Sequence, residues 1–372
     1  MSHLPPDVLR NIAASLVAAN SRPQQGNNLA RTLLGRNVEP VNSSLFSHGF
    51  FGTDQNALSR LASLGAANAN QSGAKWIYVT ERFKVFQSNL KLTESQLTDG
   101  IRKFKGVVSC LNSAYWGINS DTANAFLIGS WAKDTQIRPP RDVDLYFQLP
   151  INVYKRFEAY GPNINKQSAL LQEVKAKLLG TYQASDIKGD GPVVLAGFTS
   201  YNVEIVPAFL YDPTERSYAI CDTKNGGKYI ITKPLHEVGL LQAADLRHNQ
   251  NVRRLIRMLK CWQYWCTVPI KSFHLELLAI RFLDQWQFSD KGYFFHDWMC
   301  RDFFSWLLTP AASFIIVPGT LEVIWLSDRW KSKAQSAYDR SAKACQFESV
   351  NNMTAAGDEW QKIFGTDIPK WL

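Results

Sequence analysis

The chain has 372 residues, of which 45% are hydrophobic and 12% aromatic. This composition excludes a disordered chain, and the length allows two packed domains. Lys and Arg outnumber Asp and Glu by 41 to 32, and the net charge of +9 favours polyanionic partners. Six scattered cysteines form no disulfide framework or complete zinc-ligand pattern, and no apolar stretch is long enough to cross a bilayer. We therefore expect a cytoplasmic protein with reduced thiols and no membrane association.

The N-terminal 75 residues predict one helix and little else. Residues 7–19 place apolar side chains at helical spacing after a Pro-Pro-Asp start signal. Residues 20–75 are rich in Asn, Gln, Ser, Gly and Ala, which is typical of loops, with room for one short helix. We interpret residues 1–75 as a segment of helix and loops that packs on the rest of the protein.

Residues 76–233 alternate between helical and strand patterns. Between Thr93 and Trp116, apolar residues recur at intervals of three and four, which predicts a long amphipathic helix. Further elements are expected as strands at 125–128, 142–149, 193–198 and 201–209, a helix at 166–180 and a hairpin within 218–231. This alternation predicts a mixed α/β domain over residues 76–233.

From about Leu235 onward the pattern is mainly helical, with breaks at three prolines. The aromatic clusters of this region are interpreted as a well-filled helical core. The predicted fold class is therefore α+β, with a mixed-sheet domain at 76–233 followed by a helical domain at 234–372.

The residues that carry chemistry surround one predicted strand. A short apolar strand leads into Gly129 and Ser130, where a glycine allows close backbone approach to a ligand and a serine offers donors for phosphate. Asp142 and Asp144 lie two apart in the next apolar strand, so both side chains point to the same face. Glu204 is a third acid between apolar neighbours in a strand, where burial without a partner would be costly.

Three carboxylates beside a Gly-Ser turn form a set of oxygen ligands suited to two Mg²⁺ or Mn²⁺ ions. A lone Asp-x-Asp pair in a strand is more often solvent-facing than functional, and a lone Gly-Ser pair carries almost no information. The full order is far less expected by chance: strand, Gly-Ser, loop, Asp-x-Asp, helix, then an acid within an apolar strand. We therefore predict metal binding by Asp142, Asp144 and Glu204, with all three acting in catalysis.

This order of motifs resembles the polymerase-beta-like nucleotidyltransferases. More narrowly, it resembles the cGAS/DncV-like cyclic-oligonucleotide synthases (CD-NTases) of bacterial antiphage (CBASS) signalling, which are relatives of the oligoadenylate synthases. The resemblance extends from about residue 95 to 285 and depends on Gly129-Ser130, Asp142-Val-Asp144 and Val203-Glu-Ile-Val-Pro207. It implies a bilobed fold with the active site in the cleft.

One departure from the family concerns the third acid, which is usually Asp and here is Glu204. The additional methylene moves the carboxylate by about 1 Å, so catalysis requires a compensating backbone position.

The resemblance also implies nucleotide-binding roles outside the three acids. Lys133 fits the family's turn after Gly-Ser, and Lys260 matches a lysine that contacts the donor triphosphate. Ser272 and Phe273 match a serine that contacts phosphate and an aromatic ring that stacks on a base. The residues themselves leave two interpretations open: the basic face at 253–260 could be a solvated face of a core helix, and the Phe273 ring could be plain core.

The resemblance implies that NTPs, with ATP among them and GTP or another NTP as a second substrate, are joined into a cyclic di- or trinucleotide with release of pyrophosphate. This product would reach a downstream effector protein in antiviral defence, and a regulatory protein partner is also expected. Four alternatives stay open: a linear oligoadenylate-type enzyme, an RNA-tailing enzyme, a transferase that nucleotidylates another substrate, and a nucleotide- or RNA-binding pseudo-enzyme in which Glu204 does not support turnover.

Overall fold

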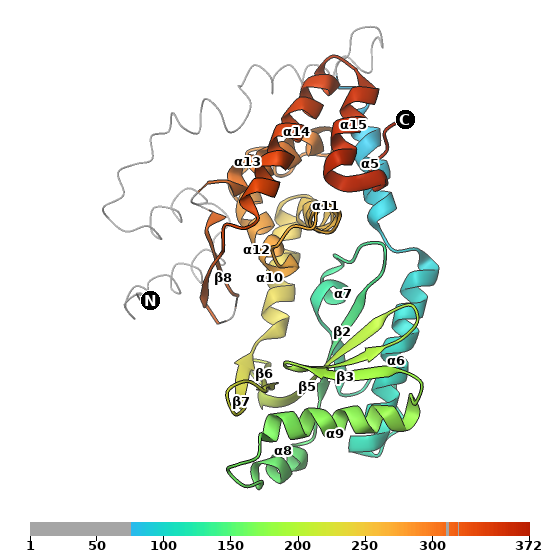
Figure 1. Ribbon diagram of the computed structural model, residues 1–372, viewed down its shortest axis with the longest axis vertical. Helices are drawn as coiled ribbons and strands as arrows, with labels where there is room; N and C mark the ends of the chain where they lie inside the picture. The colour runs from blue at the N-terminus through green and yellow to red at the C-terminus, as the bar shows by residue number, and fades with distance from the viewer. Residues whose placement is uncertain (1–75, 310–311, 319) are drawn as a thin grey trace, which may run out of the picture. The chain divides into compact units, whose positions relative to one another are not determined.

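The computed structural model describes residues 76–309, 312–318 and 320–372 (Figure 1). The helix predicted at residues 7–19 and the loops at 20–75 lie outside the described residues. The chain separates into two compact units. The sheet unit contains Asn89–Ala243, and the helical unit contains residues 76–88 together with Ala244–Leu372. A mixed sheet with flanking helices and a largely helical second unit confirm the predicted α+β fold class.

Within the described residues, the sheet unit has seven strands in one sheet, and two of them are parallel neighbours at its centre. The order is β1-β2-β5-β4-β3, and β6 and β7 continue the sheet from β5. The strands are β1 (Ala125–Leu127), β2 (Asp142–Gln148), β3 (Asp186–Asp190), β4 (Val193–Gly197), β5 (Asn202–Asp212), β6 (Ser217–Asp222) and β7 (Lys228–Thr232). Strands β2 and β5 are parallel, and the other pairings are antiparallel.

One face of this sheet is covered by helices α6 (Glu94–Trp116), α8 (Ile151–Glu158) and α9 (Lys166–Thr181), which Figure 1 shows beside the strands. Their apolar side chains form one core with Val143, Leu145, Val203 and Ile205. Successive residues of a strand point to opposite faces, so the residues between these four point away from the helices. The carboxylates of β2 therefore lie on the face opposite this core.

The helix predicted from Thr93 to Trp116 is confirmed as α6, and its ends have clear local causes. At its start, the Gln96 backbone N–H donates to the Thr93 hydroxyl (3.2 Å), while the Thr93 N–H donates to the Gln96 side chain (2.9 Å). This capping box satisfies two N–H groups that would otherwise lack partners. The helix ends at Gly117, whose φ of 65° is easily reached only by residues without a β-carbon.

Other predicted elements of the sheet unit are also confirmed. The two strands predicted at 193–198 and 201–209 pair as β4 and β5, and the hairpin within 218–231 is formed by β6 and β7. Three elements were not predicted: α8, the short helix α7 (Gly129–Lys133), where a turn was expected, and the edge strand β3. The sequence of β3, Asp-Ile-Lys-Gly-Asp, contains few residues that favour strands.

The helical unit is built mainly from six helices among the described residues, and its core is aromatic. They are α5 (Val79–Leu90), α11 (Asn251–Trp265), α12 (Ser272–Leu283), α13 (His296–Leu307), α14 (Lys331–Ser349) and α15 (Met353–Phe364). Helix α10 (Pro234–Arg247) contains the boundary between the units, as does the end of α5. The fully buried rings include Trp262, Phe303 and Phe304. A short hairpin of β8 (Phe314–Ile316) and β9 (Val323–Trp325) was not predicted. No helix among the described residues is long and apolar enough to cross a membrane.

Candidate active site

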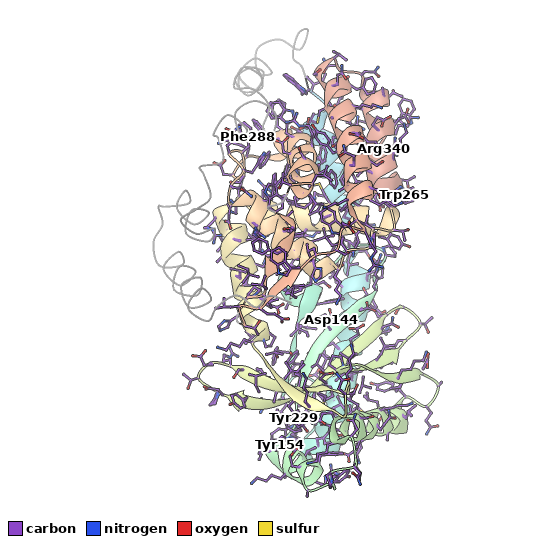
Figure 2. All side chains as sticks on the ribbon, turned by 60° about the vertical axis from the view of Figure 1, so that its left-hand side comes forward. Asp144, Tyr154, Tyr229, Trp265, Phe288 and Arg340 are labelled. Atoms are coloured by element: carbon purple, nitrogen blue, oxygen red, sulfur yellow. The ribbon has the colours of Figure 1, made fainter. Side chains whose placement is uncertain are left out.

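The parallel pairing of β2 with β5 brings the three predicted acids onto one face of the sheet. Asp142 is opposite Asn202 in the register, and Asp144 is opposite Glu204. Neighbouring strands are about 4.8 Å apart, so Asp144 and Glu204 start from adjacent backbone positions. All four side chains are partly buried, whereas Val143 between the two aspartates is fully buried in the core. Figure 2 labels Asp144 within this sheet.

Gly129 stands directly beside Asp144 at the start of the short helix α7 (Gly129–Lys133). The Ile128 backbone N–H donates to the Asp144 carbonyl (3.0 Å), which extends the pairing of β1 with β2 by one residue. Gly129 has φ +57°, and a β-carbon there would overlap the Asp144 carboxylate, within 2.9 Å of its Cγ. The backbone angle and the close approach therefore both require glycine at this position.

Replacing Gly129 with alanine is expected to reduce product formation by about 100-fold, because either α7 or the Asp144 carboxylate must move by about 1 Å to avoid the new methyl group. Steady-state pyrophosphate release measures the loss, and a thermal melt checks that the chain is folded. Gly161→Ala is the matched control, since a β-carbon at Gly161 meets nothing within 4 Å. Equal activity of the Gly129 and Gly161 variants would contradict this role for Gly129.

Trp131 holds α7 against the sheet, and sequence reasoning missed this residue. Its indole N–H donates to the Asp142 carbonyl (2.8 Å), and its ring meets that of Tyr201 edge-on at 5.8 Å. On its other side lies Gly100 of α6, where a β-carbon would be only 2.6 Å from Cζ2 of the indole. The indole thus fills the space left by a helix glycine and fixes the turn that contains Gly129 and Ser130. Ser130 is partly buried, and its carbonyl accepts the Thr135 N–H.

Asn202 is a second residue that sequence reasoning missed. Its side-chain Nδ2 donates to Asp142 Oδ1 (3.1 Å) from the directly opposite position of β5. The bond holds one carboxylate oxygen of Asp142 and thereby fixes the orientation of the other. A signal was present in the sequence, because Asn202-Val-Glu204 repeats the polar-valine-acid pattern of Asp142-Val-Asp144.

Replacing Asn202 with alanine is expected to raise the Mg²⁺ concentration needed for half-maximal activity by about 10- to 100-fold, the usual effect of losing a residue that orients a metal ligand. A titration of activity against Mg²⁺ measures the shift, and excess Mg²⁺ should restore most of the rate. Asn163→Ala, an exposed asparagine of the same unit, is the control. An unchanged half-saturation point for Asn202→Ala would leave Asn202 with no role in metal binding.

The three carboxylates, Asp142, Asp144 and Glu204, fit a hard divalent cation by their chemistry and by their backbone positions. Carboxylate oxygens are the ligands that Mg²⁺ prefers, and a register that places Asp144 opposite Glu204 gives two of them adjacent origins. Among the described residues, no three acidic, histidine or cysteine side chains already gather around one point.

Lys133, predicted to bind nucleotide, lies at the end of α7 and is 4% exposed. Its ammonium donates to Glu237 Oε2 of α10 at 3.1 Å. This pair ties the turn after Gly129-Ser130 to the helix that follows the sheet. It gives Lys133 a structural contact in addition to the predicted nucleotide contact.

The other predicted nucleotide-binding residues lie in the helical unit. Lys260 of α11 is 9% exposed and pairs with Glu276 of α12 at 2.8 Å. The alternative that residues 253–260 form a solvated basic face is therefore wrong at Lys260, and also at Arg257, which is 5% exposed. Ser272 begins α12, and its hydroxyl donates to the Gln263 side chain (2.7 Å), while Phe273 next to it is partly buried.

Comparisons with known proteins show what this chain is similar to. Residues 77–244 match the family model of the Second Messenger Oligonucleotide or Dinucleotide Synthetase domain. A curated relative from Bacillus cereus (strain VD146), described as a probable cyclic nucleotide synthase, is 22% identical over 275 residues, which is 65% of this chain and 81% of the relative.

Solved structures share the fold. The Escherichia coli MS115-1 CdnC:HORMA-deltaN complex matches with a TM-score of 0.56 and 16% identity, covering 78% of this chain and 98% of that one. CdnG of Bradyrhizobium diazoefficiens, in complex with GTP, matches with a TM-score of 0.56 and 12% identity, and the match covers 78% of this chain and 96% of CdnG. Vibrio cholerae DncV, in a 3′-deoxy GTP bound form, matches with a TM-score of 0.56 and 13% identity, and the match covers 76% of this chain and 92% of DncV.

The matched domain makes the sheet unit similar to second-messenger nucleotide synthetases, and the solved structures share the fold of the chain. The predicted resemblance to the cGAS/DncV-like synthases is confirmed as a similarity by the match of residues 77–244 and by the curated relative.

Proposed function

We propose that this protein is a metal-dependent synthase that joins NTPs into a cyclic di- or trinucleotide and releases pyrophosphate. The observation that supports it best is the register of β2 against β5, in which Asp142, Asp144 and Glu204 share one face beside Gly129. A set of three acids alone would fit several metal enzymes. The turn of Gly129 and Ser130 beside these acids, in which the serine has an N–H and a hydroxyl to donate, favours a phosphate-bearing substrate.

In this proposal, Asp142 and Asp144 hold two divalent cations, and Glu204 holds the one nearer the attacking ribose hydroxyl. Bound there, Mg²⁺ or Mn²⁺ would favour loss of the hydroxyl proton and neutralise charge on the α-phosphate and the leaving pyrophosphate. Asn202 keeps Asp142 in one orientation through its 3.1 Å hydrogen bond. Gly129 leaves room for the Asp144 carboxylate, and Ser130 offers its N–H and hydroxyl to phosphate oxygens.

Nucleotide contacts from the helical unit belong to the same proposal. Lys260 would contact the donor triphosphate, Ser272 a phosphate oxygen, and Phe273 would stack on a base. An ammonium group carries three N–H donors, so the pairing of Lys260 with Glu276 is compatible with a phosphate contact. Since Glu276 is also buried, removing Lys260 alone would leave a buried carboxylate, and a Lys260→Ala variant needs Glu276→Gln as its companion.

The substrates and partners are proposed from the relatives. One CdnC structure contains ATP, another is a complex with HORMA-deltaN, and the CdnG and DncV structures contain GTP or a GTP analogue. We infer that the present chain uses ATP, alone or with GTP or another NTP, and that a regulatory protein partner controls it. The cyclic product would act on a separate effector protein in antiphage defence.

Incubation with four NTPs and Mg²⁺ or Mn²⁺, followed by phosphatase treatment, tests this function. A phosphatase-resistant product that contains no terminal phosphate supports a cyclic nucleotide. A linear product that loses its terminal phosphates to phosphatase favours the oligoadenylate-type alternative. Extension of an added RNA favours the tailing enzyme. If the protein binds NTPs but releases no pyrophosphate with either Mg²⁺ or Mn²⁺, it is the pseudo-enzyme alternative, in which Glu204 does not support turnover.

A further inference from the structure

A hollow of about 330 Å³ lies on the helical unit, among residues from the end of α11, from α14 and from α15. None of its residues is among those proposed for nucleotidyl transfer. Figure 2 labels two of them, Trp265 and Arg340, on the same side of the molecule. The lining residues are Trp262, Trp265, Cys266, Thr267, Lys333, Ser336, Ala337, Arg340, Lys362 and Ile363. Its volume is at the small end of the range of known small-molecule sites.

The lining of the hollow is positively charged. Lys333, Arg340 and Lys362 line it, and no acidic side chain does. Glu359, which is not among the lining residues, forms ion pairs with two of these cations, at 3.3 Å from Arg340 and 2.5 Å from Lys362. The Lys333 side chain makes no hydrogen bond or ion pair with any residue in the described part of the chain. The three cations and the Glu359 carboxylate together carry a charge of about +2. This charge favours binding of an anion with more than one negative charge in the hollow.

Two tryptophans provide the aromatic part of the same hollow. Trp265 is 52% exposed, an unusual state for a large ring, and Gly365 packs against it, since a β-carbon there would be 2.7 Å from its Cε3. Trp262 is fully buried, and its indole Nε1 has no hydrogen-bond partner among the described residues. A buried indole N–H normally finds an acceptor. The hollow thus combines an accessible ring with cations within one small site.

We propose that this hollow binds a nucleotide, with the base against Trp265 and the phosphates held by Lys333, Arg340 and Lys362. A nucleotide is the class that satisfies both halves of the lining, because its base stacks on an indole and its phosphates accept from ammonium and guanidinium groups. The site would give the protein a nucleotide-binding event that uses none of the carboxylates of the sheet unit. The inference therefore does not depend on the proposed function.

The test uses the full chain carrying Asp142→Asn and Asp144→Asn, in EDTA, with ATP as the probe. Calorimetry and quenching of tryptophan fluorescence should both report binding. Lys333→Gln, which removes a cation without breaking an ion pair, should weaken ATP binding by about tenfold, as expected for the loss of one charge-assisted contact. Trp265→Leu should weaken it by a similar factor. The control is Lys343→Gln, an exposed lysine of α14 that does not line the hollow.

Three results would overturn the proposal. One is an ATP affinity that neither Lys333→Gln nor Trp265→Leu changes. Another is an equal loss in the Lys343→Gln control, which would reflect only general charge. The third is inorganic triphosphate binding as tightly as ATP and being insensitive to Trp265→Leu, since the base would then make no contact. A thermal melt of each variant separates loss of binding from loss of folding.

Discussion

Replacing Asp144 with alanine is expected to reduce product formation by at least about 10³-fold while the protein stays folded. Asp144 is central to the candidate site, with Glu204 opposite it in the register and Gly129 against its carboxylate. Under the proposed function, its loss would remove a ligand of a metal ion that contributes several kcal/mol of charge stabilisation. Its side chain is only partly buried, and removing one of several neighbouring negative charges relieves repulsion, so the melting temperature should be unchanged or slightly higher.

Pyrophosphate release and the amount of phosphatase-resistant product measure this effect. Asp186→Ala is the matched control, because Asp186 is an exposed carboxylate on the edge strand β3 of the same sheet. Asp142→Ala should behave like Asp144→Ala. If a folded variant lacking both Asp142 and Asp144 turned over like the natural protein, metal-dependent catalysis at this face of the sheet would have to be abandoned.

Replacing Glu204 with glutamine is expected to cost nearly as much, about 10³-fold. Glutamine keeps the size and polarity of the side chain but removes the charge that would hold a cation near the attacking hydroxyl. Glu204 faces Asp144 on one neighbouring strand and Leu195 on the other, so no second acid of β4 is placed to take over. Glu215→Gln, at an exposed acid of the turn between β5 and β6, is the control.

Glu204→Asp tests how the site accommodates the longer acid. If the backbone is adjusted to glutamate, aspartate falls about 1 Å short and activity drops by about 100-fold. If glutamate is merely a poor substitute for the usual aspartate, the same change raises activity. Full activity of Glu204→Gln at saturating Mg²⁺ would show instead that this acid has a structural role.

The sequence predicted the parts of the site that depend on local chemistry. The period of two along a strand places Asp142 and Asp144 on one face, and the structure has them there. The start of α6 was predictable for the same reason, because its capping box lies within four consecutive residues from Thr93 to Gln96. Gly129 was singled out by its position after a strand, and its positive φ and its contact with Asp144 supply the physical cause.

The sequence could not predict which residues meet across the fold. The alignment of Asp144 with Glu204 depends on a parallel pairing between strands about 60 residues apart, and local patterns do not fix such a register. The contact of Lys133 with Glu237 spans 104 positions, so its burial could not be foreseen from a lysine after Gly-Ser. Asn202 was overlooked because an amide in a strand carries no signal until its partner, Asp142, is known.

The packing of Trp131 against Gly100 has a consequence for natural variation. The two positions share one volume, since the indole occupies the space that any side chain at position 100 would need. A larger residue at position 100 is therefore compatible with the same turn only if position 131 becomes smaller in the same lineage. Related chains should accordingly vary at these two positions together, with glycine at position 100 wherever position 131 carries a large ring.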